Sequence, residues 1–162
     1  MRTVPVLDNG MVQRKNFTMS YSLQIVVDCL NPHDLADWWA ETMGWQREPS
    51  DEGFIRSMVE QGFATEDETL VHNGVLVWAA GAAIQPGAGA QPGQPRILFQ
   101  TADGTKTSKN RVHWDVRLGG EDKAAVRERL EARGASFLWE AAQGPHEWFT
   151  MADPEGNEFC IS

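Results

Sequence analysis

Polar and apolar side chains alternate along residues 110–117, which is the pattern of a strand with one buried face. Successive side chains of a strand point to opposite faces, so His113, Asp115 and Arg117 are predicted to share one face. We expect the valines and the tryptophan between them to pack against a helix. If the polar face lines a cavity, its imidazole, carboxylate and guanidinium form a site. If that face is fully solvated, they are ordinary surface residues.

Similar patterns predict the remaining elements. Apolar residues at helical spacing indicate helices at residues 31–43, 51–61 and 121–133, each followed by a glycine that can end it. The Asn73-Gly74 pair predicts a hairpin between residues 69 and 78. Further strands are predicted at residues 22–29, 45–47, 96–100, 137–139, 148–152 and 157–162. Residues 85–95 and 141–146 are predicted to be loops.

The order of these elements suggests an internal duplication. Strand, helix and strands occur twice, and the two strand–helix units can be laid over each other. Gln24 and His113 lie 89 residues apart, and the helix-ending Gly44 and Gly134 lie 90 residues apart. Offsets that agree within one residue predict a tandem β-α-β-β-β unit, with the helix at residues 51–61 as an extra element of the first copy.

Composition narrows the class of protein. The formal net charge of −9 argues against a nucleic-acid surface, which needs a basic stripe. No apolar run is long enough to span a bilayer, so no membrane partner is expected. The two cysteines, Cys29 and Cys160, make no disulfide framework, and no signal peptide is recognised. We therefore expect reduced thiols and a cytoplasmic location.

Several stretches together resemble the vicinal oxygen chelate superfamily, which includes glyoxalase I, bleomycin-resistance proteins and extradiol dioxygenases. The first half contributes Val27-Asp28-Cys29, Asn31-Pro32, Trp38-Trp39 and residues 95–100, and the second half contributes residues 109–115 and the turn at residues 153–158. More narrowly, the chain resembles single-domain glyoxalase-like proteins of bacteria. The Asp-Pro-Glu-Gly turn before a final strand, together with the His113 strand, is typical of the fold and not of one reaction.

The resemblance implies an α+β fold. Two tandem βαβββ modules would form a curled mixed sheet shaped as a cup, with the helices outside. We expect an N-terminal arm at residues 1–19 and a glyoxalase-like domain at residues 20–162. Module one would span residues 20–108 and include the extra helix at residues 51–61, and module two would span residues 109–162.

The resemblance also implies where a metal would bind. Metal-dependent members place one ligand on the first and one on the last strand of each module, which carries over by position to Gln24, Gln100, His113 and Cys160. Cys160 stands where the second module of those members has a glutamate, so a hard cation would lack carboxylate ligands. Asp115 or Glu158 could substitute. The chain is accordingly expected to hold either no cofactor or one divalent metal.

Other residues are candidates for ligand binding, and each has a simpler interpretation. Gln24, Asp28, Gln100, Trp78, Trp148 and His146 could line the cup, with His146 in a loop at its mouth. Tryptophans are more often core residues, Cys160 could be a small buried apolar residue, and Asp115 could serve only to pair with an arginine. His33 and His72 are predicted to be surface residues.

Two functions follow from these candidates. The first is a small-molecule-binding protein without chemistry, whose acidic surface suits cationic ligands. The alternative is a lyase, isomerase or dioxygenase, either metal-dependent or with His113 as general base oriented by Asp115. Because many relatives dimerise, a homodimer is expected.

Overall fold

The computed structural model describes residues 23–87 and 94–162, so the predicted arm at residues 1–19 lies outside the described residues. The fold is α+β, as predicted, and its strands form two four-stranded sheets and a separate two-stranded hairpin. No helix among the described residues has the length and hydropathy needed to cross a membrane.

The N-terminal sheet has the strand order β1-β6-β5-β2, with β1 parallel to β6 and the other neighbours antiparallel. Its elements are β1 (Ile25–Cys29), α1 (Pro32–Met43), β2 (Gln46–Arg47), β5 (Gly81–Gln85) and β6 (Ile97–Thr101). Helix α1 begins with a proline at its first turn and ends at Gly44, whose φ of 63° suits the left-handed conformation of a helix stop.

The C-terminal sheet repeats this topology, with the order β7-β10-β9-β8 and with β7 parallel to β10. Its elements are β7 (Trp114–Val116), α3 (Lys123–Glu131), β8 (Ser136–Gln143), β9 (His146–Ala152) and β10 (Glu158–Ile161). In each sheet the first strand pairs with the last, so the duplication predicted from the spacing is confirmed.

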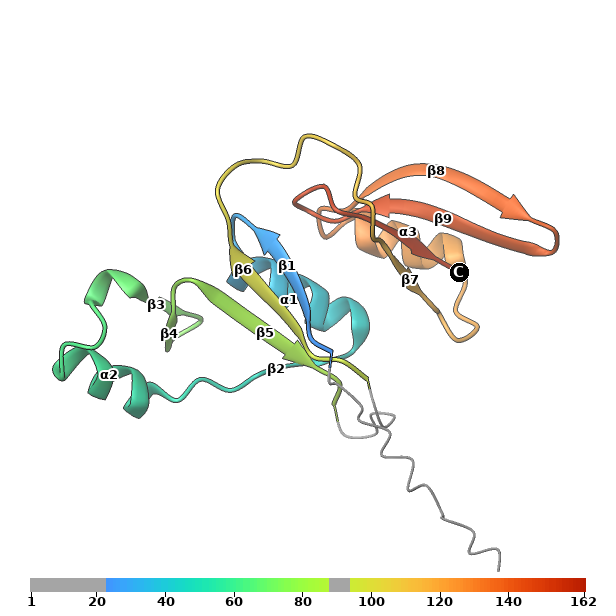
Figure 1. Cartoon of the computed structure of the whole chain (residues 1–162). Helices are drawn as coiled ribbons and strands as arrows, with labels where there is room; N and C mark the ends of the chain where they lie inside the picture. The colour runs from blue at the N-terminus through green and yellow to red at the C-terminus, as the bar shows by residue number, and fades with distance from the viewer. Residues whose placement is uncertain (1–22, 88–93) are drawn as a thin grey trace, which may run out of the picture.

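Residues between β2 and β5 form an insertion that the second module lacks. It contains α2 (Glu52–Glu60), the 3₁₀ turn η1 (Glu66–Glu68), β3 (Thr69–His72) and β4 (Val75–Trp78). The hairpin turn places Asn73 at φ 50° and Gly74 at φ 83°, the conformation that an Asn-Gly pair favours. Figure 1 shows the insertion projecting from the edge of the molecule, far from the C-terminal sheet.

The helices cover one face of each sheet and share one core. Figure 1 shows α1 against the N-terminal sheet and α3 against the C-terminal sheet. Trp39, on α1, packs edge-on against Trp114 of β7 and Phe159 of β10, with ring centroids 4.5 and 5.0 Å apart. The prediction that Trp38 and Trp39 are core residues is therefore confirmed.

The Asp-Pro-Glu-Gly turn fastens the second module to α1. The buried Asp153 accepts a hydrogen bond from Trp39 Nε1 at 3.0 Å. Glu155 accepts backbone hydrogen bonds from Leu30 and Asn31, at 2.7 and 2.8 Å, just before the helix begins. This turn of the second half, which resembles that of glyoxalase-like proteins, thus connects the two modules in this chain.

Three predictions need correction. Residues 141–146 are not a loop, because β8 and β9 pair as far as Gln143 and His146 and place His146 on a strand. The strand predicted at residues 110–117 is regular only over Trp114–Val116. His33 is not a surface residue: it is only 6% exposed, because the inserted hairpin closes over it.

Candidate functional site

The polar face of the C-terminal sheet carries the residues that the sequence pattern singled out. Asp115 is paired across the sheet with Cys160, and Cys160 is paired with Thr150, so these three side chains share a face. His113 and Arg117 lie two residues on either side of Asp115 and are exposed like it, whereas Trp114 and Val116 pack against the core. The alternation therefore predicted the facing of residues 113–117 correctly. It was wrong for Val112, which was expected to pack beside Trp114 but is 77% exposed, because the regular strand begins only at Trp114.

This face lines a cavity of about 580 Å³. The predicted site residues His113, Asp115, His146, Trp148 and Cys160 all border it. Gln143, Pro145 and Glu147 also border the cavity and were not predicted, because residues 141–146 were interpreted as a loop and the long hairpin that forms one wall was missed. Ser162, the residue after β10, borders it too.

Three potential donor groups converge in this cavity. One ligand atom from each of His113, Asp115 and Cys160 lies within 4.8 Å of the other two. His113 Nε2 is 3.5 Å from Asp115 Oδ1, and both side chains are substantially exposed to the cavity, at 43% and 55%. Cys160 is buried at the floor, with its Sγ 3.7 Å from Thr150 Oγ1. Burial raises the pKa of the Cys160 thiol, and the Asp115 carboxylate adds to that effect.

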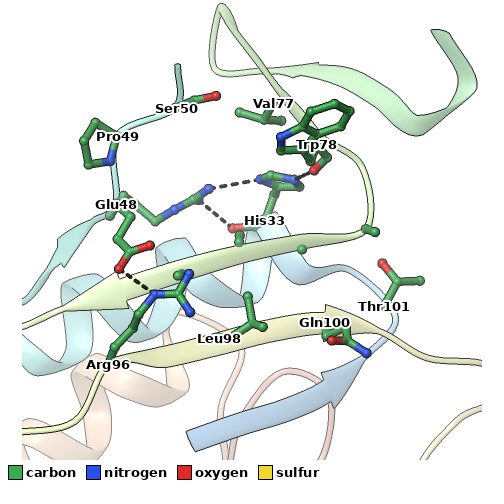
Figure 2. Close-up of a pocket in the computed structure, with 15 residues that line it drawn as sticks. His33, Glu48, Pro49, Ser50, Val77, Trp78, Arg96, Leu98, Gln100 and Thr101 are labelled. Carbon is green, nitrogen blue, oxygen red and sulfur yellow. Dashed lines mark hydrogen bonds and ion pairs between the residues drawn. The ribbon is translucent and has the colours of Figure 1, made fainter. Parts of the chain in front are cut away.

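A second cavity, of about 460 Å³, lies on the polar face of the N-terminal sheet (Figure 2). Gln100 and Trp78, both predicted ligand-binding residues, line it. Arg96 lies beside them and pairs with Glu48 at 2.5 Å. Gln24 is at the end of the same sheet, where its amide oxygen accepts a hydrogen bond from Arg96.

A partly buried polar network around the buried His33 holds the wall of this second cavity. His33 lies between the Arg47 guanidinium and the backbone carbonyl of Trp78, and Figure 2 shows its ring beside Trp78. Arg47 Nη2 donates to His33 Nδ1 at 3.0 Å, which leaves Nε2 to donate to Trp78 O at 2.9 Å. On the other side, Asp37 pairs with Arg47 and with His72, whose Nε2 is 2.6 Å from the carboxylate. No sequence pattern pointed to this network, since its partners are brought together by the insertion.

A third cavity, of about 260 Å³, separates the two modules. It lies between β1 and the residues leading into β7, and Asp28 and His113 both line it. His113 thus borders this inter-module cavity and the C-terminal cavity. Within one chain, Gln100 belongs to the N-terminal cavity, whereas His113 and Cys160 belong to the C-terminal one. The metal site predicted from Gln24, Gln100, His113 and Cys160 therefore stays a prediction. The donors that lie close together in the structure are His113, Asp115 and Cys160.

The donor chemistry of the C-terminal cluster fits a borderline-soft metal. An imidazole nitrogen, a carboxylate oxygen and a sulfur are all ligands of Zn²⁺, and three protein ligands leave a position free. Glu158, the other residue that could replace the missing carboxylate ligand, has other partners. It accepts hydrogen bonds from Lys106 Nζ at 2.9 Å and from Asn110 N at 3.0 Å. Burial alone would raise the pKa of Glu158, but these two hydrogen bonds outweigh it and lower the pKa.

The chain belongs to the glyoxalase-like domain family, whose model matches residues 24–162. No relative was found among curated protein sequences. The resemblance to the vicinal oxygen chelate superfamily is confirmed by this match and by the folds of similar solved structures.

Among solved structures, a mutant of the fosfomycin resistance protein FosX from Listeria monocytogenes, in complex with Mn(II) and 1S,2S-dihydroxypropylphosphonic acid, superposes with a TM-score of 0.57. It is 12% identical, over 88% of this chain and 91% of that chain. FosX from Mesorhizobium loti gives 0.56 at 6% identity, over 88% and 90% of the chains. The oxidase ChaP-H2 gives 0.53 at 12% identity, over 88% and 93%. At these identities the likeness establishes the fold.

Proposed function

We propose that the chain is a glyoxalase-like small-molecule-binding protein and that its ligand occupies the C-terminal cavity. One observation carries the proposal: His113, Asp115 and Cys160, together with Trp148 and His146, face one cavity of about 580 Å³. That volume lies within the range of small-molecule sites, and the cavity combines an indole with a few polar groups that can orient a ligand.

The charges around the cavity favour a small ligand that is both flat and polar. Trp148 offers an aromatic surface, while Asp115 and Arg117 bring charges of opposite sign to the lining. The net charge of −9 raises the local concentration of cationic compounds. A cationic aromatic compound therefore fits both the indole and the overall field of the protein.

The second candidate is a lyase, isomerase or dioxygenase, and the convergence of His113, Asp115 and Cys160 favours it. His113 Nε2 would accept a proton from the ligand, and Asp115, 3.5 Å away, would stabilise the resulting imidazolium. A metal bound by these three residues would polarise an oxygen of the ligand. Trp148 would hold the ligand in either function, so binding is the property that the two candidates share.

We also propose that the protein is a homodimer. Two apolar side chains that line the inter-module cavity are exposed to solvent, Val26 at 49% and Val112 at 77%, and Leu23, two residues before β1, is 75% exposed. Exposed apolar residues that gather on one side of a molecule are typical of an interface. The side of the molecule that carries β1 and the start of β7 is therefore the proposed contact between copies.

Thermal denaturation with a panel of fosfomycin, bleomycin and ethidium tests the binding proposal. A compound at about 100 times its Kd stabilises the folded state by about 2.7 kcal/mol, which should raise the Tm by roughly 5–10 °C for a chain of this size. We expect at least one compound to do so, and His113→Ala to abolish the shift while the exposed Glu128→Ala keeps it. Stabilisation that persists in His113→Ala would contradict the proposed site.

A further inference from the structure

The convergent donors in the C-terminal cavity all come from one sheet of one module. His113 lies just before β7, and Asp115 lies on β7 two residues further on. Cys160, on the neighbouring β10, is paired with Asp115. Their placement therefore depends on strand register, which is fixed by the buried Phe159 and Ile161 on the opposite face of β10. A metal held here needs no residue from the N-terminal sheet.

The spacing of the donors suits a tetrahedral ion. Nitrogen and oxygen ligands about 2.0–2.1 Å from Zn²⁺ lie roughly 3.4 Å from each other in a tetrahedral site. His113 Nε2 and Asp115 Oδ1 are 3.5 Å apart, and the sulfur of Cys160 lies within 4.8 Å of both. Because the side chains of His113 and Asp115 are 43% and 55% exposed, they are not locked by packing, and small side-chain movements would bring all three donors to one ion.

The same donor set is unsuited to a hard cation. Mg²⁺ and Mn²⁺ favour oxygen ligands, and the cluster offers one carboxylate. Glu147 borders the cavity, but its carboxylate faces Lys123 Nζ at 3.8 Å. The thiol, by contrast, is a ligand that Zn²⁺ and Co²⁺ accept readily.

We infer that His113, Asp115 and Cys160 form a thiolate-containing metal site that binds Zn²⁺ in preference to Mn²⁺ and Mg²⁺. This inference deepens the function proposed above and rests on it, since the metal would occupy the floor of the proposed ligand cavity. A thiol that binds a metal is deprotonated, so Cys160 releases its proton when the ion binds. The positions not taken by protein remain available to a ligand or to water.

Cobalt substitution of the full-length protein tests the inference directly. Co²⁺ replaces Zn²⁺ in such sites, and a sulfur ligand adds an intense near-ultraviolet charge-transfer band that nitrogen and oxygen ligands do not produce. We expect Co²⁺ to bind at one ion per chain with this band, and Zn²⁺ to displace it. After dialysis against equal concentrations of Zn²⁺ and Mn²⁺, retained Zn²⁺ should exceed Mn²⁺ at least tenfold.

Two cysteine variants give a matched comparison. Cys160→Ser should abolish the charge-transfer band, and His113→Ala and Asp115→Asn should each weaken Co²⁺ binding by at least about tenfold. Cys29→Ser should leave the band unchanged, since Cys29 is a buried residue at the end of β1 in the N-terminal sheet, where its Sγ lies 3.5 Å from Gln100 O. Circular dichroism of every variant checks that it is folded.

Several outcomes would overturn the inference: no Co²⁺ bound, Co²⁺ bound without the band, a band that survives in Cys160→Ser, or Mn²⁺ retained as strongly as Zn²⁺. These failures are distinguishable from failure of the proposed function. If the metal experiment fails while a panel compound still stabilises the metal-free protein through His113, the cavity binds small molecules without a metal.

Discussion

Asp153 illustrates, at the scale of single residues, how a motif visible in the sequence acts in the fold. It is 3% exposed and receives hydrogen bonds from the Trp39 indole and from the backbone of Glu155 and Asn157. Both carboxylate oxygens are therefore occupied. The loss of even one acceptor would leave a buried donor unpaired.

Replacing Asp153 by asparagine should destabilise the protein by about 2–3 kcal/mol. The asparagine NH₂ group cannot accept a hydrogen bond, so at least one of the N–H groups that now donate to the Asp153 carboxylate would lose its acceptor. Urea denaturation of Asp153→Asn beside the wild type measures the effect. Asp103→Asn, in an exposed loop after β6, is the matched control and should change stability by less than about 0.5 kcal/mol. Equal stability of the two variants would refute the role assigned to Asp153.

The candidate site shows which residues a sequence can reveal. His113, Asp115 and Cys160 could be placed on one face because strand alternation has a fixed period and needs only the register of two strands. His33 could not, since nothing in the pattern at residues 31–43 indicates that a hairpin forty residues further on covers the first turn of the helix. Contacts that an insertion makes cannot be predicted from the sequence pattern around the residues that it covers.

At the scale of elements, the inserted hairpin is attached to α1 and β2 through one titratable cluster. Burial lowers the pKa of His33 below its ordinary 6.5, and the positive charges of Arg47 and His72 lower it further, while the hydrogen bond to the Trp78 carbonyl acts in the opposite direction. The neutral ring is the form that accepts a hydrogen bond from Arg47.

Acidification should therefore weaken the folded state through His33. Its pKa is lower in the folded chain than in the unfolded one, so the unfolded chain binds more protons as the pH falls below 6.5. The stabilisation is complete above that pH and is lost as the pH falls through the folded pKa. For Asp37, burial would raise the pKa, but His72 and Arg47 lower it below 3.8, so its contribution is lost only in more acidic solution.

Urea midpoints measured from about pH 7 to about pH 5 check this expectation. His33→Gln should flatten the profile over that range, because glutamine can replace both hydrogen bonds without titrating. His146→Gln, which changes an exposed histidine of β9, should keep the wild-type slope. An unchanged slope in His33→Gln would show that other groups govern the acid response.

Element boundaries were predicted where the local signal was strong. The helices and the Asn73-Gly74 hairpin have clear start and stop residues, and the structure places them within a few residues of the prediction. Strand β5 and the outer part of β8 were missed because Gly81, Ala82 and Ala141 have little intrinsic strand preference. Pairing with β6 and β9 supplies the stabilisation that these residues lack.

At the scale of the whole molecule, the repeated spacing predicted two modules of equal topology, but it could not predict how their polar faces are combined. Among the described residues, separate cavities lie on the two sheets, and a further cavity lies between the modules. That arrangement depends on the packing of Trp39 and on the Glu155 contacts across the module boundary. Such long-range packing has no signature in local periodicity.

The proposed dimer predicts a mass of about twice the 18.0 kDa of the chain in light scattering after size-exclusion chromatography. Val112→Glu should yield a monomer, because a charge would be buried in the contact. Val71→Glu changes a comparably exposed valine, at 69%, on the inserted hairpin and should leave the dimer intact. A monomeric wild type, or a dimer that persists in Val112→Glu, would contradict the assignment.

An amide chemical-shift map of the protein with a compound that stabilises it tests the location of the binding site most directly. If the C-terminal cavity is the binding site, the largest changes should occur at residues 113–117, 146–148 and 160–162, and His113→Ala should remove them. Changes concentrated on α2 and the inserted hairpin, with the C-terminal sheet unaffected, would show that the ligand does not bind in the C-terminal cavity.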